Sequence, residues 1–124
     1  MIKIVKEISA EKLCEVIVEG MQDNKAEDIV VIDLREVESA VTDFFVIASG
    51  ESTTQVDGIA NAVVRSTRKT LKEKPWHQEG KNSAQWVLLD YVNVVAHVFH
   101  KDVRDYYELE DLWADGKKRQ IANL

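Results

Sequence analysis

Two short apolar runs restrict the folds open to this chain more than any other feature. Ile29–Leu34 and Phe44–Ala48 are rich in β-branched residues and lack the alternation of a strand with one solvated face. Such runs are typical of strands that are buried on both faces. A sheet built from them needs a covering layer on each side, which predicts an α/β fold with helices flanking a mixed sheet. The polar stretch 36–43 between the runs is predicted to be a loop.

Capping signals place the helices. A first helix is predicted to begin after Ser9 and a second after Ser52, which forms a capping box with Gln55. A third helical stretch is predicted over Val103–Trp113 with Asp102 as its cap.

The remaining segments complete the predicted domain. Extended segments are expected at 2–5 and 76–80, and residues 114–124 are predicted to form a flexible, frayed tail. Residues 1–124 are therefore expected to form a single domain whose mixed sheet has about five strands. The number of residues suffices for a hydrophobic core without metals or disulfides.

A hairpin is predicted for the segments on either side of the turn Val92-Asn93. In the predicted register, Asp90 faces Val95, Leu88 faces His97 and Trp86 faces Phe99. These six side chains then share one mixed surface. The opposite surface is almost wholly apolar and is predicted to be core, with Val87, Leu89, Tyr91, Val94, Ala96 and Val98.

Charge and cysteine content limit partners and compartment. The net charge of −6 makes the surface repel phosphate backbones, which disfavours nucleic acid as the main contact and favours a basic protein. The single cysteine, Cys14, is interpreted as a packing residue, and no Cys/His spacing resembles a metal site. We find no signal pattern and no run of membrane-spanning length, so the sequence predicts a cytoplasmic protein without membrane association.

Several stretches, in order from about Asp28 to Trp113, resemble the ribosomal silencing factor family, also called Iojap-like. The matching pieces are Thr42–Gly50, Ser52 with Gln55-Val56, Glu79-Gly80, Trp86–Asp90, Val95–Phe99 and Tyr107–Trp113. One departure is the hairpin turn, where the family usually has Gly-Asp and this chain has Val92-Asn93. A β-branched residue resists the positive φ of a tight turn, which puts the turn geometry and the cross-strand register in question.

The resemblance implies a nucleotidyltransferase-like fold without transferase chemistry or cofactor. It implies binding to the large ribosomal subunit through a ribosomal protein at the subunit-joining face. Such binding would block association with the small subunit sterically, and the family is also implied to assist large-subunit maturation. Several members form homodimers, which makes a homodimer one implied state of this chain.

The mixed hairpin surface is the predicted partner-binding site. Trp86 has two interpretations, core beneath a helix or anchor for a partner, and the resemblance favours the anchor. Asp90 and His97 are diagonal neighbours in the predicted register, within hydrogen-bonding reach, and structural pairing is favoured over catalysis. The predicted partner-binding residues are Trp86, Leu88, Asp90, His97, Phe99, Asp43, Lys101, Arg104 and Tyr107.

Two other interpretations stay open at this stage. The first is a metal-dependent, nucleotidyltransferase-like enzyme that uses Asp43, Asp90 and His97; in this view Ser52 belongs to a catalytic Gly-Ser turn rather than to a helix cap. The second concerns a basic stripe, which is either a solvated helix face or a secondary contact to ribosomal RNA. The stripe consists of Arg65, Arg68, Lys69 and Lys72.

Overall fold

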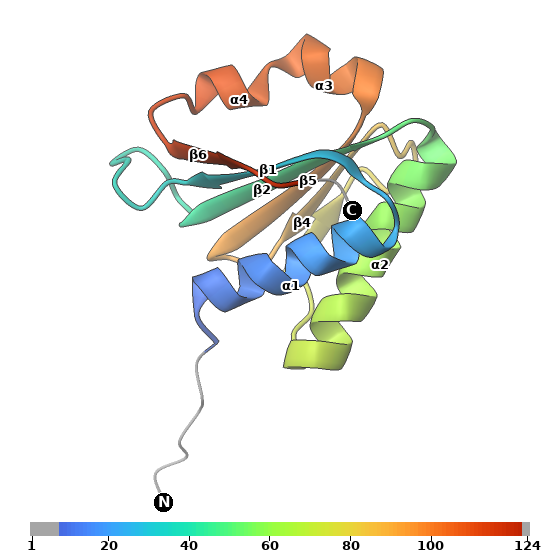
Figure 1. The fold of residues 1–124 in the computed structure, drawn as a ribbon, viewed down its shortest axis with the longest axis horizontal. Helices are drawn as coiled ribbons and strands as arrows, with labels where there is room; N and C mark the ends of the chain where they lie inside the picture. Colours follow the sequence, from blue (N-terminus) through green and yellow to red (C-terminus); the bar gives the residue numbers. More distant parts are fainter. Residues whose placement is uncertain (1–7, 123–124) are drawn as a thin grey trace, which may run out of the picture.

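A mixed sheet lies between two helical layers, as Figure 1 shows for this computed structural model, which describes residues 8–122. Helices α1 (Ala10–Asp23) and α2 (Thr53–Leu71) cover one face. Helices α3 (Lys101–Tyr107) and α4 (Leu109–Leu112) lie over the other. The predicted α/β class is therefore confirmed. The predicted extended segment 2–5 lies outside the described residues.

The sheet has six strands in the order β3-β4-β5-β2-β1-β6. All neighbouring strands are antiparallel except the central pair, β2 and β5, which run parallel. The strands are β1 (Glu27–Asp33), β2 (Phe44–Gly50), β3 (His77–Glu79), β4 (Trp86–Asp90), β5 (Val94–His100) and β6 (Lys117–Gln120). Every residue of β2 is buried, as expected for a strand covered on both sides.

The layer of α1 and α2 closes the main core. Ser9 and Ser52 cap these helices as predicted, accepting from the backbone N–H groups of Lys12 and Gln55. The Gln55 side chain reaches back to the N–H of Glu51 rather than that of Ser52. Gly20 lets the two helices approach closely, because a Cβ there would lie 2.9 Å from the Cα of Val63.

The predicted hairpin register is confirmed. Trp86 pairs with Phe99, Leu88 with His97 and Asp90 with Val95. The apolar surface of the hairpin lies in the core beneath the sheet, against α2, also as predicted. The turn reaches this register although Val92 has a φ of +74°.

The third helical stretch is broken, contrary to the prediction of one helix over Val103–Trp113. Glu108 adopts the left-handed conformation and separates α3 from α4. The cap of α3 is His100, whose Nδ1 accepts from the N–H of Asp102, so the predicted cap is wrong by two residues. The helix begins at Lys101, two residues before the predicted start at Val103, because β5 runs directly into α3.

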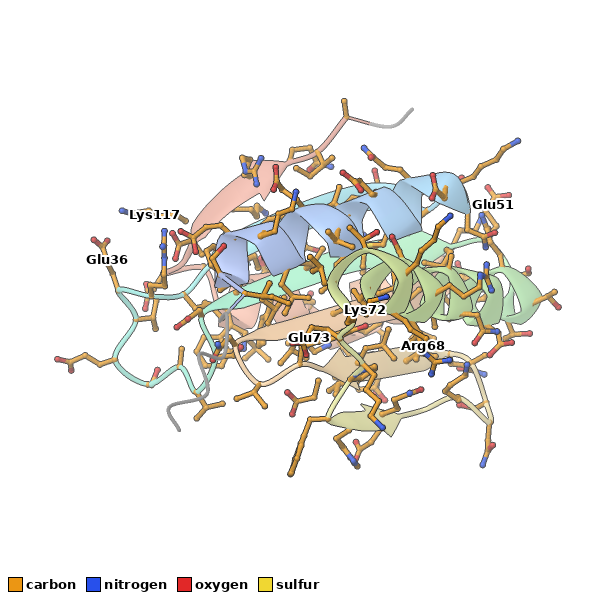
Figure 2. All side chains as sticks on the ribbon, turned by 90° about the horizontal axis from the view of Figure 1, so that it is seen from below. Glu36, Glu51, Arg68, Lys72, Glu73 and Lys117 are labelled. Carbon is orange, nitrogen blue, oxygen red and sulfur yellow. The ribbon has the colours of Figure 1, made fainter. Side chains whose placement is uncertain are left out.

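The predicted flexible tail 114–124 is wrong over Lys117–Gln120, which form β6 and pair with β1. This strand brings the sheet to six strands rather than five. Its formation has a physical cause, since pairing with β6 satisfies backbone groups along the otherwise open edge of β1. Figure 2 shows Lys117 beside Glu36, where their charged groups are 3.0 Å apart.

Candidate partner-binding site

Three aromatic rings meet on the sheet face beneath α3. The ring of Trp86 stacks on that of Phe99 with centroids 4.8 Å apart, and its other neighbour is Tyr107, also at 4.8 Å. The hairpin register sets the first contact, because Trp86 and Phe99 are directly paired across β4 and β5. The structure thus brings together four of the predicted site residues, Trp86, His97, Phe99 and Tyr107.

His97 lies at the centre of this cluster. Its Nδ1 accepts a hydrogen bond of 3.1 Å from the indole Nε1–H of Trp86, which fixes the neutral tautomer with the proton on Nε2. Nε2 has no hydrogen-bond partner among the described residues, and the ring of Phe45 lies edge-to-face at 4.7 Å. Burial lowers the pKa of His97 to about 3, so the ring stays neutral at ordinary pH.

The predicted pairing of Asp90 with His97 is not formed. The Asp90 carboxylate instead accepts a 2.7 Å hydrogen bond from the backbone N–H of Val92. The turn exposes this N–H two residues along the chain, so the carboxylate satisfies a local donor rather than a cross-strand ring. Asp90 and His97 therefore do not form an acid–base pair.

Only part of the predicted surface is accessible. Trp86, Leu88 and Asp90 are half-buried, because α3 packs on β5 and β2 and leaves the outer face of β4 open. His97 is 3% exposed and Phe99 is fully buried. Their burial does not support the prediction that these two side chains contact a partner; both rings pack against Trp86 instead.

Arg104 holds the α3–α4 segment on the sheet. Its guanidinium donates to the carbonyl of Asp28, to the hydroxyl of Ser49 and to the carboxylate of Glu110. Burial raises the pKa of Glu110, but the bonds and charges of Arg104 and Lys118 outweigh it and hold that pKa below its usual value. The Arg104 side chain is only 10% exposed. Its geometry therefore indicates a structural role rather than the predicted partner contact.

The nine predicted residues do not form one surface. Asp43 is half-buried at the start of β2, where its N–H donates to the carbonyl of Asn93 beside the hairpin turn. Lys101 is exposed and shares a polar pocket with Arg104 at the opposite end of that strand. The two ends are about 20 Å apart, given the rise of a strand.

An open groove beside Trp86 includes residues that the sequence prediction missed. These residues come from the loop before β4 and from α3. They are distant in sequence and follow no common motif, so no sequence signal indicated that they meet. Its lining consists of Ser83, Gln85, Trp86, Asp102, Val103, Tyr106 and Tyr107.

The geometry gives no support to the enzyme interpretation. Ser52 is fully explained as the cap of α2, since its hydroxyl accepts from the N–H of Gln55 at 3.1 Å. Asp43 and Asp90 lie at the other end of the sheet, by the hairpin turn. Within residues 8–122, no three His, Cys, Asp or Glu side chains gather closely enough to hold a metal ion.

Comparison with known proteins settles the family. The model of the family described as "Ribosomal silencing factor during starvation" matches residues 7–124. The chain belongs to the ribosomal silencing factor family. A relative named ribosomal silencing factor RsfS from Halalkalibacterium halodurans is 40% identical over 117 residues, covering 94% of this chain and 98% of the relative.

Other similar proteins extend the comparison. The mouse protein named "Mitochondrial assembly of ribosomal large subunit protein 1" is 32% identical over 114 residues, covering 87% of this chain and 50% of the mouse protein. A crystal structure from Chromobacterium violaceum has a TM-score of 0.81 at 32% identity, covering 93% of both chains. A second, from Bacillus halodurans, has a TM-score of 0.75 at 35% identity, covering 90% of this chain and 98% of that one.

In the described part of this chain, no helix has the length and apolar character needed to cross a membrane.

Proposed function

We propose that this protein binds the large ribosomal subunit through a basic ribosomal protein at the joining face and sterically blocks association with the small subunit. It acts in the cytoplasm and needs no cofactor. Ribosomal RNA is a secondary contact, and a homodimer is the proposed oligomeric form. A role in large-subunit maturation accompanies the silencing, as the name of the mouse relative suggests for that protein.

The observation that carries the proposal is the open outer face of β4. Trp86, Leu88 and Asp90 are half-buried there, whereas the opposite face of the same strand is closed by helices. A mixed apolar and acidic face beside a supported aromatic ring has the composition of an interface centre. The net charge of −6 favours a basic partner protein over the phosphate backbone of RNA.

Co-sedimentation with isolated large subunits, small subunits and assembled ribosomes tests the proposal. We expect the wild-type protein to sediment with large subunits and to reduce subunit joining in a reconstituted mixture. Leu88→Lys should abolish both effects, because it places a long cation on the face that meets a basic partner.

Leu71→Lys is the matched control, since Leu71 is a half-buried leucine on the other side of the sheet. It should sediment like the wild type, provided that both variants keep the wild-type circular dichroism spectrum. Absence of wild-type binding to large subunits at micromolar concentration would refute the proposed function. Equal losses in both variants would refute the proposed face.

A further inference from the structure

A groove lies beside Trp86 on the α3 side of the sheet. It has a volume of about 570 Å³ and lies between the loop before β4 and the exposed side of α3. Trp86 forms part of its wall and belongs to the open face described above. The groove is therefore continuous with the proposed partner surface.

Aromatic rings form most of its apolar wall. Trp86 and Tyr107 lie at 4.8 Å with their planes tilted by 48°, and Tyr106 meets Tyr107 edge-on at 5.2 Å. Tyr106 is 80% exposed and Tyr107 is 48% exposed, so both retain ring surface that contacts no protein atom. The negative π-faces of such rings attract a cation.

The polar part of the groove offers hydrogen-bond acceptors. Asp102 contributes a carboxylate whose side chain is 79% exposed, and Ser83 and Gln85 contribute neutral oxygens. The seven described residues that line the groove include no basic side chain.

The carboxylate of Asp102 forms no ion pair with a lysine or arginine among the described residues. Its ion-pair contact among the described residues is with His100, at 3.8 Å. The Nδ1 of that ring accepts from the N–H of Asp102, so this nitrogen carries no proton in the structure. The groove thus combines three rings with one exposed carboxylate that forms no ion pair with a lysine or arginine among the described residues.

We propose that this groove binds an arginine side chain of the partner protein. This inference rests on the proposed function and specifies what that partner presents to the α3 side of the surface. The planar guanidinium stacks on the aromatic rings and donates two parallel hydrogen bonds to the Asp102 carboxylate. Arginine fits better than lysine, because a compact ammonium group neither stacks on a ring nor pairs in a bidentate manner.

Titrations with small probes, followed by NMR, test the inference. N-acetylarginine amide should shift the indole N–H resonance of Trp86 and the ring resonances of Tyr106 and Tyr107. The neutral isostere N-acetylcitrulline amide should bind roughly tenfold or more weakly, because it loses both the cation–π attraction and the charge pairing. N-acetyllysine amide with a free ε-ammonium should also bind less tightly than the arginine probe. Equal affinity for the arginine and citrulline probes would overturn the inference, as would equal affinity for arginine and lysine.

Exposed side chains allow variants that keep the fold. Tyr106→Ala and Asp102→Asn should each weaken the arginine probe several-fold. Leu112→Ala and Asp111→Asn are the matched controls, being exposed changes of similar kind on α4 that should leave binding unchanged. Unchanged binding in Tyr106→Ala and Asp102→Asn would also overturn the inference.

Further outcomes separate this inference from its alternatives. If the same resonances shift on simple dilution of the protein, the groove is filled by a second copy of the chain and the partner assignment is wrong. If Tyr106→Ala and Asp102→Asn sediment with large subunits like the wild type, while Leu88→Lys does not, the groove inference fails and the proposed function stands. If the wild type does not sediment at all, the proposed function itself fails.

Discussion

The two faces of the sheet are covered in different ways. The face beneath α1 and α2 is closed by side chains that are almost completely excluded from solvent, such as Ile17, Ile59 and Val63. On the other face, neither α3 nor α4, both described in full, contains a fully buried residue. Burial drives folding mainly through the first face. The second face has a smaller buried cluster, and the segments that cover it leave aromatic and acidic groups half-exposed.

Buried polar groups show the same contrast. Beneath α2, the hydroxyls of Thr67 and Tyr91 bond to each other at 2.9 Å, and burial raises the pKa of Tyr91 to about 12. Beneath α3, His97 is bonded through Nδ1 while its Nε2 has no partner among the described residues. An unpaired buried donor destabilises the fold. The unpaired Nε2–H of His97 therefore destabilises the α3 face, whereas the paired hydroxyls of Thr67 and Tyr91 cause no such loss on the α1/α2 face.

Truncation of one apolar side chain on each face gives the largest expected effect. Ile59→Ala should lower the free energy of unfolding by about 2–5 kcal/mol, because it leaves a cavity in a closed core. Val103→Ala removes a half-buried side chain of α3 and should cost about 1 kcal/mol. Urea denaturation of both variants measures the two losses. Similar losses would show that the two faces contribute equally to stability.

Removal of Arg104 should detach the α3–α4 segment. Arg104→Ala deletes three hydrogen bonds, one of them to a partly buried carboxylate, and should cost about 2–3 kcal/mol. Amide exchange should accelerate over residues 101–112 while the strands keep their protection. Lys101→Ala, an exposed change one turn away, should change stability by less than about 0.5 kcal/mol. Unchanged exchange in Arg104→Ala together with lost large-subunit binding would instead make Arg104 a contact residue.

Acid should weaken the fold through His97. Its pKa is about 3 in the folded protein, whereas an unfolded histidine titrates near about 6.5. Below about pH 6.5 the unfolded chain therefore takes up a proton that the folded chain does not, and stability falls as pH falls, until about pH 3. The loss from this group between pH 7 and pH 5 should be about 2 kcal/mol.

His97→Gln isolates that contribution, since glutamine offers Trp86 an acceptor and does not titrate. The difference in unfolding free energy between pH 7 and pH 5 should shrink by about 2 kcal/mol in this variant. An unchanged difference would mean that His97 accepts a proton in the folded state, for example by movement of α3.

The elements that the sequence predicted correctly are those with local signals. The side chains of Ser9 and Ser52 cap the helices that follow them, so they mark where each helix begins. The continuous apolar run of Phe44–Ala48 indicates a strand that is buried on both faces. The alternation along β4 and β5 also fixed the hairpin register, because a shift of one residue would expose the apolar surface.

The features that the sequence did not predict depend on distant contacts. β6 carries four exposed polar side chains, so its strand character comes from backbone pairing with β1 rather than from a pattern of its own. The break at Glu108 has no glycine to mark it. His97 bonds to Trp86 rather than to Asp90, since the turn offers the carboxylate a closer donor. Nothing in the sequence indicated that Tyr106 lines the groove, because helical spacing does not tell which side of a helix is covered.

The hairpin turn gives the smallest expected effect, yet both faces depend on the register it sets. Val92 has a φ of +74°, and the N–H of Asn93 donates to the carbonyl of Tyr91 across it at 3.0 Å. A β-branched residue in the left-handed region costs about 1–2 kcal/mol, part of which glycine returns as entropy of the unfolded chain. Val92→Gly should therefore stabilise the protein by about 0.5–1 kcal/mol in urea denaturation. Val41→Gly, an exposed loop change without a positive φ, should give no gain. A loss of stability in Val92→Gly would show that the valine side chain contributes more through contacts than its backbone strain costs.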